Sequence, residues 1–362
     1  MEPLRFAIFG SSLVSSYWNG AATYYRGIAR VLHEHGHHVA FYEPDAWGRQ
    51  EHRDIDDPDY ARVVVYEPES AAAVRAQVRA AAEVDVIVKT SGVGVFDDVL
   101  EEAVAEVDGA LRVFWDVDAP ATLARMEQDA DDPSRALIAE YDLILTYGGG
   151  APVIRRYEAL GARRCVPIYN ALDPSMHHPV AAQERFAADL TFLGNRLPDR
   201  EARVREYFFA TAERLPDQRF LLGGSGWDDL APRHNLRSLG HVSTADHNAL
   251  NASALAVLNV SREGMASNGH SPATRVFEVA GAAGCLITDA WPGIKEFLEP
   301  GREVLVAHDG AEVALLLENL EPEHARAIGA AARARVLADH TYEHRVERLE
   351  TALLDRLPGR AL

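Results

Sequence analysis

The sequence alternates short apolar segments with longer amphipathic ones, and this alternation constrains the fold more than any other feature. Each apolar segment has three to six residues, rich in Val, Ile, Leu and Phe, and the segments between them have the length and polarity of helices. A strand, a crossover helix and a second strand form a parallel unit, so we predict an α/β fold. The predicted strands are residues 4–9, 39–42, 63–65, 84–89, 111–115, 143–146 and 165–168, followed by 190–193, 219–222, 236–239, 256–260, 285–288 and 304–307.

These strands fall into two series, separated by residues 174–183. That segment has no strand or helix period and contains two prolines, so we interpret it as a hinge. A chain of 362 residues is also longer than one hydrophobic core usually organises. We therefore predict one open α/β domain over residues 1–180 and a second over residues 186–340. Two helices are predicted in the last 40 residues, at 323–337 and 343–354.

The charge and the cysteine content bear on partners and location. The 36 Lys and Arg residues against 55 Asp and Glu residues give a formal net charge of −19, which repels nucleic acid and anionic membranes. An anionic ligand therefore requires a local positive site. Cys165 and Cys285 lie in apolar segments, which predicts small buried side chains and no disulfide. No apolar run of about 18 residues occurs, and we expect a cytoplasmic protein with no integral membrane segment and no nucleic-acid partner.

The first predicted strand runs into a turn of glycine and hydroxyl residues, Gly10-Ser11-Ser12. The dinucleotide fingerprint G-x-G-x-x-G needs three glycines at fixed spacing, and the second and third are missing here, which disfavours an NAD-dependent dehydrogenase. The turn is either a tight strand-to-helix connection or a ligand-binding loop. In the second interpretation Ser11 and Ser12 bind the ligand, and Trp18 offers a flat apolar face to a sugar or aromatic ring.

Two carboxylates, Asp116 and Asp118, follow an apolar strand segment, at the position where α/β folds place functional groups. Asp118 is a candidate N-cap ahead of Pro120, which would be a structural role. The alternative is that one carboxylate acts as a general base toward a hydroxyl, or holds that hydroxyl by a hydrogen bond. Trp115, beside them, is a second candidate surface for a ring.

Glycine-containing loops follow two successive predicted strands of the second series. Glycine lets the main chain approach a ligand closely, and arginine supplies positive charge for a phosphate. One such loop is weak evidence, but repetition at successive strand ends predicts a site for an anionic ligand. The residues are Gly194, Asn195 and Arg196 in the first loop, and Gly223, Gly224 and Ser225 in the second.

The most informative segment follows the fourth predicted strand of the second series, where a polar loop leads into a helix. We predict Ser271 as its N-cap and Pro272 as its first helical residue. Arg275 and Glu278 are three residues apart and share a helix face. They form a surface salt bridge or, alternatively, hold a diphosphate and the hydroxyl pair of a ribose, respectively. Arg262 adds positive charge in the preceding loop.

With these residues the sequence resembles GT-B fold glycosyltransferases that have a group 1 C-terminal domain, and most closely their CgeB-like branch. The resemblance covers nearly the whole chain. It is carried by residues 10–12, 17–20, 41–45, 167–173, 178–179, 274–289, 293–297 and 300–305. It implies two Rossmann-like domains facing across a cleft, with an acceptor site in the first and a nucleotide-sugar donor site in the second. It also implies that the C-terminal helix, residues 341–362, returns to the first domain.

The resemblance also implies roles for individual residues. Glu278 would bind the ribose hydroxyls, with Arg275 and Arg196 near the diphosphate. Group 1 enzymes often carry Glu-x7-Glu, and the first of these positions holds His270 here. Either His270 replaces the first acid, where it would contact the diphosphate or the donor sugar, or Glu263 serves after an insertion.

The predicted activity is transfer of a sugar, of the hexosyltransferase type, from a nucleotide sugar to a hydroxyl of a small molecule or glycan. The strand ends of the second series carry no D-x-D pair, so we expect no obligatory metal and no cofactor beyond the nucleotide-sugar co-substrate. Asp118 or Asp116 is the candidate base if the reaction inverts configuration, whereas retention, which we favour, needs no protein base. A nucleotide-sugar 2-epimerase and a non-catalytic nucleotide-sugar binding protein are the alternatives.

Overall fold

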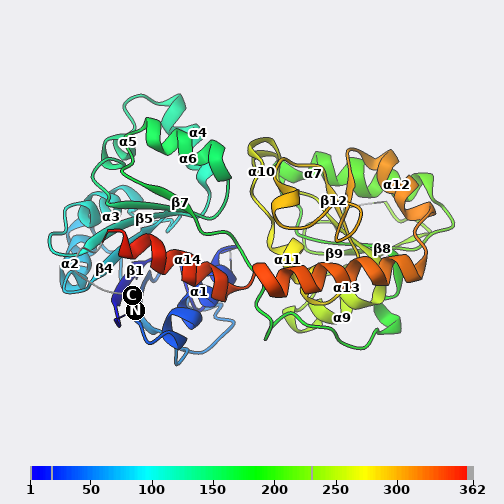
Figure 1. Ribbon diagram of the computed structural model, residues 1–362, viewed down its shortest axis with the longest axis horizontal. Helices are drawn as coiled ribbons and strands as arrows, with labels where there is room; N and C mark the ends of the chain where they lie inside the picture. Colours follow the sequence, from blue (N-terminus) through cyan, green and yellow to red (C-terminus); the bar gives the residue numbers. More distant parts are fainter. Residues whose placement is uncertain (1, 18, 230, 357–362) are drawn as a thin grey trace. The chain divides into compact units, whose positions relative to one another are not determined.

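The computed structural model describes residues 2–17, 19–229 and 231–356, and the chain divides into two compact units (Figure 1). Unit 1 comprises Met1–Tyr169 together with Tyr342–Leu362, and unit 2 comprises Asn170–Thr341. Each unit is a parallel sheet with helices on both faces. The C-terminal helix belongs to unit 1, so the predicted return of this helix to the first domain is confirmed.

Unit 1 is built on a seven-stranded parallel sheet with the strand order β3-β2-β1-β4-β5-β6-β7. Its central strands are buried along nearly their whole length, as expected for a sheet covered by helices on both faces. The strands are β1 (Arg5–Phe9), β2 (His38–Pro44), β3 (Arg62–Tyr66), β4 (Val86–Thr90), β5 (Leu111–Asp116), β6 (Leu143–Thr146) and β7 (Cys165–Pro167). The helices are α1 (Ala22–Glu34), α2 (Ala71–Ala81), α3 (Asp97–Ala105), α4 (Ala119–Gln128), α5 (Pro133–Leu137), α6 (Gly150–Ala159) and α14 (Tyr342–Leu354).

Helices from opposite ends of the chain pack together in unit 1, where α14 lies against α1 (Figure 1). The approach is close because residue 27 is a glycine: a Cβ at Gly27 would lie 2.4 Å from the ring of Tyr342. On the opposite face of the sheet, helices α2, α3 and α6 cover an apolar cluster that includes Phe9, Phe114 and Ile144. The sheet is therefore enclosed on both sides, and its ligand-accessible parts are the loops at the strand ends.

Unit 2 is built on a six-stranded parallel sheet with the strand order β10-β9-β8-β11-β12-β13. Helices α9, α11 and α13 cover one face, and α7, α8 and α12 cover the other (Figure 1). The strands are β8 (Ala188–Leu193), β9 (Phe220–Gly223), β10 (Leu236–Gly240), β11 (Ala254–Asn259), β12 (Leu286–Asp289) and β13 (Leu305–Ala307). The helices are α7 (Pro198–Val204), α8 (Ala210–Arg214), α9 (His247–Ser253), α10 (Glu263–Asn268), α11 (Thr274–Gly281), α12 (Gly310–Glu318) and α13 (Pro322–Asp339).

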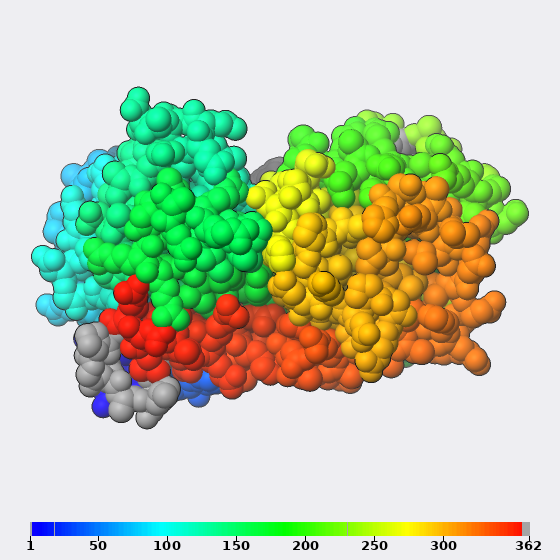
Figure 2. Space-filling view, turned by 45° about the horizontal axis from the view of Figure 1, so that its top comes forward, coloured from blue at the N-terminus to red at the C-terminus, as the bar shows by residue number. Residues whose placement is uncertain are grey.

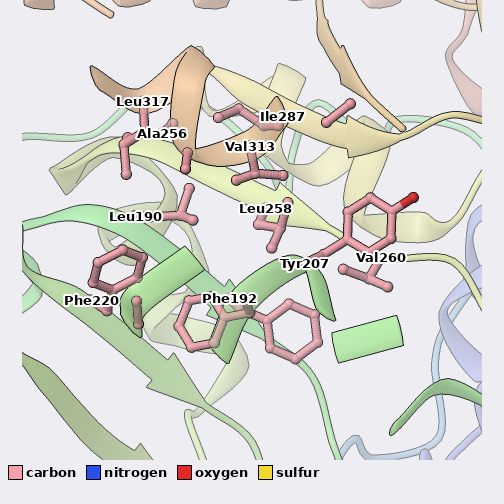
Figure 3. Packing of buried hydrophobic residues seen from close by; sticks show 14 of the residues in the cluster. Leu190, Phe192, Tyr207, Phe220, Ala256, Leu258, Val260, Ile287, Val313 and Leu317 are labelled. Atoms are coloured by element: carbon pink, nitrogen blue, oxygen red, sulfur yellow. The ribbon is translucent and has the colours of Figure 1, made fainter. Parts of the chain in front are cut away.

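The main core of unit 2 lies between its sheet and α12. Phe192, Phe220 and Leu258 point from the strands into this cluster and meet Val313 and neighbouring side chains (Figure 3). On the other face, α13 packs so closely on the segment after α11 that a Cβ at Gly329 would lie 2.1 Å from the carbonyl oxygen of Ala283. Helix α13 lies at the surface of unit 2, and the residues on its outer side are exposed (Figure 2).

Both sheets have the strand order of a doubly wound fold, with the switch in chain direction between β1 and β4 in unit 1 and between β8 and β11 in unit 2. In such sheets ligands bind outside the carboxyl ends of the strands at this switch. The thirteen strands that the sequence predicts are all confirmed, as are the two C-terminal helices. The predicted strand-end loops therefore lie at the edges where ligands are expected.

One local prediction is wrong. Helix α11 begins at Thr274 with Ala273 at the N-cap position, not with Ser271 as N-cap. The hydroxyl of Ser271 donates instead to the main-chain oxygen of Gly269 at 3.1 Å, because the left-handed backbone of Gly269 and His270 turns the loop before the helix. The residues 174–183 contain no strand or helix, as predicted, and they lie within unit 2.

None of the helices within residues 2–17, 19–229 and 231–356 is both long and apolar enough to cross a bilayer. Cys165 and Cys285 are buried and free, as predicted.

Candidate functional site

The two predicted glycine loops of unit 2 lie against each other at the ends of β8 and β9. The amide of Gly194 donates to the carbonyl oxygen of Gly223 at 2.9 Å, and the amide of Ser225 donates to Oδ1 of Asn195 at 2.9 Å. Gly224 has φ +119°, and a Cβ there would lie 2.2 Å from the carbonyl oxygen of Gly194. The structure thus brings all five of these predicted residues together, and main-chain packing between the loops requires the glycine at 224.

Arg196, predicted to lie near the diphosphate, is held by acidic neighbours. It forms ion pairs with Glu201 at 2.7 Å and Asp229 at 2.7 Å, and its guanidinium lies over the ring of Trp227. The hydrogen bonds that Arg196 donates to these two carboxylates raise its pKa, and hydrogen bonds from Arg196 and Arg205 lower the pKa of Glu201 to about 2. With its charge already matched, Arg196 has the geometry of a residue that holds the loop together rather than one that awaits a phosphate.

A second arginine, Arg200, was missed by sequence reasoning. Its Nη2 donates to the carbonyl oxygen of Asn195 at 2.6 Å, while its buried Nε has no hydrogen-bond partner. Burial and the nearby charges of Arg275 and Arg262 lower the pKa of Arg200. Arg262 itself is half-exposed and pairs with Asp199 at 2.6 Å. Arg200, Arg262 and Arg275 therefore form a positive cluster at the carboxyl edge of the sheet, in a chain that is acidic overall.

Arg275 and Glu278 lie on α11, as predicted, with Nη1 of Arg275 2.7 Å from Oε2 of Glu278. These groups are not aligned as a hydrogen bond: Nε and Nη1 of Arg275 and Oε2 of Glu278 are buried without hydrogen-bond partners. Burial alone would raise the pKa of Glu278, but the charge of Arg275, together with His177 and His247, lowers it below its usual value. Glu278 is therefore a buried, ionised acceptor beside unused donors, which differs from an exposed salt bridge.

Two histidines that the sequence did not single out accompany this pair. His247 begins α9, which packs on α11, and His177 lies in the irregular segment 174–183. Nδ1 of each imidazole is buried without a hydrogen-bond partner. No local pattern signals them, because packing between distant segments brings them to Glu278.

His270, at the position of the first acid, is fixed in the loop before α11. It has φ +48°, its amide donates to the carbonyl oxygen of Pro292 at 2.6 Å, and its Nδ1 lies 2.9 Å from a carboxylate oxygen of Glu296. A Cβ at Gly293 would lie 2.4 Å from the imidazole, so the ring lies directly against that glycine. By contrast, Glu263 is exposed on α10 and pairs loosely with Arg203 of α7, at 3.4 Å. Because His270 is fixed and Glu263 is exposed, the geometry favours His270 over Glu263 as the residue that takes the place of the first acid.

In unit 1 the candidate residues of β5 turn inward. Asp116 is fully buried; its Oδ1 accepts hydrogen bonds from Ser91, Thr122 and the amide of Asp118, and its Oδ2 accepts one from Tyr157. Burial raises the pKa of Asp116 although these four donors oppose the shift. A carboxylate with every oxygen occupied in this way is placed to organise the loop, which favours a structural role over the predicted role as base.

Trp115 is also buried, at 3% exposure, and its indole donates to the hydroxyl of Tyr24 at 3.1 Å. This favours a core role over the predicted contact with an acceptor. Ser11 donates to Asn19, and Ser12 donates to the buried Glu43, so both hydroxyls are engaged within the loop. Trp18 lies outside the described residues. Among these candidates Asp118 is the one that is half-exposed, at the start of α4, and its side chain makes no capping hydrogen bond.

The carboxyl edge of unit 1 instead presents aromatic rings that sequence reasoning missed. Trp47 is 62% exposed and Phe96 is 38% exposed, and both have positive φ, at 60° and 50°. The indole of Trp47 donates to the carbonyl oxygen of Gly94 at 3.3 Å, and buried Arg49 donates to carbonyl oxygens of both the β1 and β4 loops. Strained backbone at exposed aromatic residues is a feature of binding loops.

No group of three or more His, Cys, Asp or Glu side chains is placed to hold a metal ion within the described ranges 2–17, 19–229 and 231–356. At the carboxyl edge of unit 2, Arg196, Arg203 and Arg262 are paired with acids, whereas Arg275 and Glu278 keep buried atoms without hydrogen-bond partners. Chemically, this arrangement can bind a compact anion and accept hydrogen bonds from neighbouring hydroxyls.

Known proteins share this fold and part of this sequence. Residues 200–351 match the family model described as Glycosyl transferase-like. Sucrose-phosphate synthase from Thermosynechococcus elongatus has a TM-score of 0.72 at 13% identity, with 97% of this chain and 98% of that chain covered. HepE from Anabaena, in complex with UDP and glucose, has a TM-score of 0.68 at 13% identity, covering 97% and 100%. AviGT4, a glycosyltransferase involved in avilamycin A biosynthesis, has a TM-score of 0.61 at 17% identity, covering 99% of each chain.

No curated protein sequence matches the chain. At these low identities the structural similarities establish the fold alone. The chain has two Rossmann-like domains of the GT-B type, and its residues 200–351 match the glycosyl transferase-like family.

Proposed function

We propose that this protein is a glycosyltransferase that transfers a hexose from a nucleotide sugar to a hydroxyl-bearing acceptor. The family match over residues 200–351 and the shared GT-B fold support the reaction class. The observation that carries the proposal is the pair Arg275 and Glu278, buried at the carboxyl edge of unit 2 with hydrogen-bonding atoms unused. Leaving a buried polar group unpaired costs about 1–3 kcal/mol, so this edge is built for a polar ligand.

The proposed donor contacts follow from charge and position. Glu278, an ionised acceptor, takes a hydrogen bond from a ribose hydroxyl, and Arg275 and Arg200 direct unused N–H groups to the diphosphate. The start of α11 adds the positive end of a helix dipole. Arg262 contributes charge from the rim, and Arg196 supports the loop. HepE binds UDP, which makes UDP the first nucleotide to test here.

The proposed acceptor side is unit 1. The exposed rings of Trp47 and Phe96 offer apolar faces to a sugar or an aromatic ring, and Asp118, after β5 of the same sheet, offers a half-exposed carboxylate. Because arginines match the negative charge of the leaving phosphate, we propose a metal-independent reaction with no added cofactor. We also propose that the reaction retains configuration, which needs no protein base. Membership of the CgeB-like branch and a cytoplasmic location belong to the same proposal.

Nucleotide binding tests the donor assignment. UDP and UDP-glucose at saturating concentration should raise the melting temperature by several degrees, because a ligand that binds the folded state stabilises it by mass action. Glu278→Gln should abolish most of the shift, since it removes the ionised acceptor. Glu318→Gln, an exposed acid at the end of α12, is the matched control and should retain the shift. If no nucleoside diphosphate or nucleotide sugar in a broad panel moves the melting temperature, the proposed function is wrong.

A further inference from the structure

A histidine beside Glu278 has no role in the contacts described so far. His247 is the first residue of α9, and it forms a hydrogen bond to the main chain of Val242. Its other ring atom, Nδ1, is buried and has no hydrogen-bond partner. Because α9 packs on α11, the imidazole interacts electrostatically with Arg275 and Glu278 as well as with His177.

The protonation state of this imidazole is set by its surroundings. Burial, followed by the positive charge of Arg275, lowers the pKa of His247 to about 4, although Glu278 opposes the shift. His247 is therefore neutral at physiological pH. A neutral imidazole has one N–H donor and one nitrogen that accepts through its lone pair. Because the other ring nitrogen donates its N–H to a main-chain oxygen, Nδ1 is the nitrogen with the lone pair and is an acceptor.

Nδ1 of His247 and the carboxylate of Glu278 are thus two acceptors on neighbouring helices, and acceptors do not satisfy each other. Oδ1 of Asn248, the next residue of α9, is a third buried acceptor without a partner. The charge of Arg275 lies beside Glu278, but no described donor reaches Nδ1 of His247, so a ligand that fits this set brings hydroxyl donors of its own. Two adjacent hydroxyl groups, one for each of the first two acceptors, are the chemistry that fits.

We propose that His247 reads the ribose of the nucleotide donor, accepting a hydrogen bond from one ribose hydroxyl through Nδ1 while Glu278 accepts from the other. This inference rests on the proposed function and adds a specificity: the site distinguishes ribonucleotides from deoxyribonucleotides. A site built to bond a hydroxyl rejects the ligand that lacks it, because its own buried groups are left unpaired.

The test compares the affinities of UDP, 2′-deoxy-UDP and 3′-deoxy-UDP by titration calorimetry. The wild type should bind UDP at least tenfold more tightly than one of the deoxy forms. His247→Leu, which removes the acceptor, should reduce that ratio to about threefold or less. His247→Asn, whose side-chain oxygen can occupy the position of Nδ1, should restore most of it. His241→Leu, an exposed histidine in the loop before α9, is the matched control and should keep the wild-type ratio.

A residue with only a packing role would change stability and would weaken all three ligands equally. A wild type that binds UDP and both deoxy forms alike, or a His247→Leu variant that keeps the wild-type ratio, overturns the inference and leaves the proposed function standing. If His247→Leu does not fold, His247→Ala provides the same comparison. The ratio of UDP affinity to deoxy-UDP affinity in the wild type tests the inference without any variant. A wild type that binds no nucleotide overturns the proposed function itself.

Discussion

Units 1 and 2 have the same strand order at their ligand edges, but Glu278 of unit 2 differs from the buried carboxylates Asp116 and Glu43 of unit 1 in its hydrogen bonding. In unit 1, Asp116 accepts four hydrogen bonds and Glu43 accepts three, all from within the unit. In unit 2, Glu278 and Arg275 keep buried atoms without hydrogen-bond partners. Asp116 and Glu43 are therefore satisfied within unit 1, whereas Glu278 keeps an oxygen without a hydrogen-bond partner, which supports placing the charged ligand in unit 2.

The two units also differ in the aromatic rings at their carboxyl edges, which are exposed in unit 1 and buried in unit 2. Unit 1 exposes large rings, Trp47 and Phe96, on loops with positive φ at its carboxyl edge. In unit 2, Trp227 is buried against the glycine loops and donates to the carbonyl oxygen of Gly194. An edge that presents exposed aromatic rings suits a ligand recognised by its shape and apolar faces. Three changes would break or sharpen this contrast.

The largest expected effect is on the loop packing of unit 2. Gly224→Ala places a Cβ 2.2 Å from the carbonyl oxygen of Gly194, and main-chain atoms cannot move aside as a flexible side chain can. We expect a loss of roughly 3 kcal/mol in the free energy of unfolding, measured by urea denaturation.

The control for this change is Gly92→Ala in unit 1. Gly92 has φ +69° and also follows a strand, but nothing lies within 4 Å of a Cβ there, so only the backbone strain of about 1 kcal/mol applies. Equal losses for the two variants would show that close packing between the β8 and β9 loops is not a special feature of unit 2.

The second effect separates arginines with matched charge from those with unused donors. Arg275→Ala should weaken UDP binding at least tenfold, because it removes N–H groups that have no partner within the protein. Arg196→Ala should weaken it less than threefold, because its partners are Glu201 and Asp229. Calorimetric titration of both variants measures the difference. A larger loss for Arg196→Ala would restore the diphosphate role that the sequence predicts for it.

The sequence predicts the strands and the C-terminal helices of both units well, because fully buried parallel strands read as short apolar runs whatever surrounds them. It also places Arg275 and Glu278 on one helix face, since three-residue spacing is a local property. Pairing across the fold is not local. Of the two acids that pair with Arg196, Glu201 is close in the sequence, but Asp229 comes from the loop after β9, and nothing in the Gly194-Asn195-Arg196 segment signals it.

The same limit explains the candidate residues of unit 1. A tryptophan and an aspartate at a strand end have the same local pattern whether they face a ligand or the core. For Trp115 and Asp116, the hydrogen bonds from Trp115 to Tyr24 and from Tyr157 to Asp116 decide the matter, and both partners are distant in the sequence. Trp47 and Phe96 were missed for the converse reason, because no strand or helix period marks an exposed loop residue.

The smallest expected effect concerns the docking of α14 within unit 1. His35 and His37 each lie 2.9 Å from Glu350, and His35 also lies 2.7 Å from Glu343. Burial lowers the pKa of His35, but hydrogen bonds to Glu350 and Glu343 outweigh it and the net shift is upward. Burial raises the pKa of Glu350, but His37 and His35 outweigh it and the net shift is downward.

The signs of these shifts define a pH window. A raised histidine pKa gives stability that is complete below the unfolded value of about 6.5 and is lost as the pH rises through the folded value. A lowered glutamate pKa gives stability that is complete above about 4.3 and is lost as the pH falls. The cluster should therefore stabilise unit 1 most between these values, and raising the pH from 5.5 to 8.5 should cost about 0.5 kcal/mol in urea denaturation, a typical value for a partly exposed pair. His35→Gln should remove this loss, and the exposed control His33→Gln should keep it. If His35→Gln has the same pH dependence as the wild type, α14 is held by its apolar contacts with α1 alone.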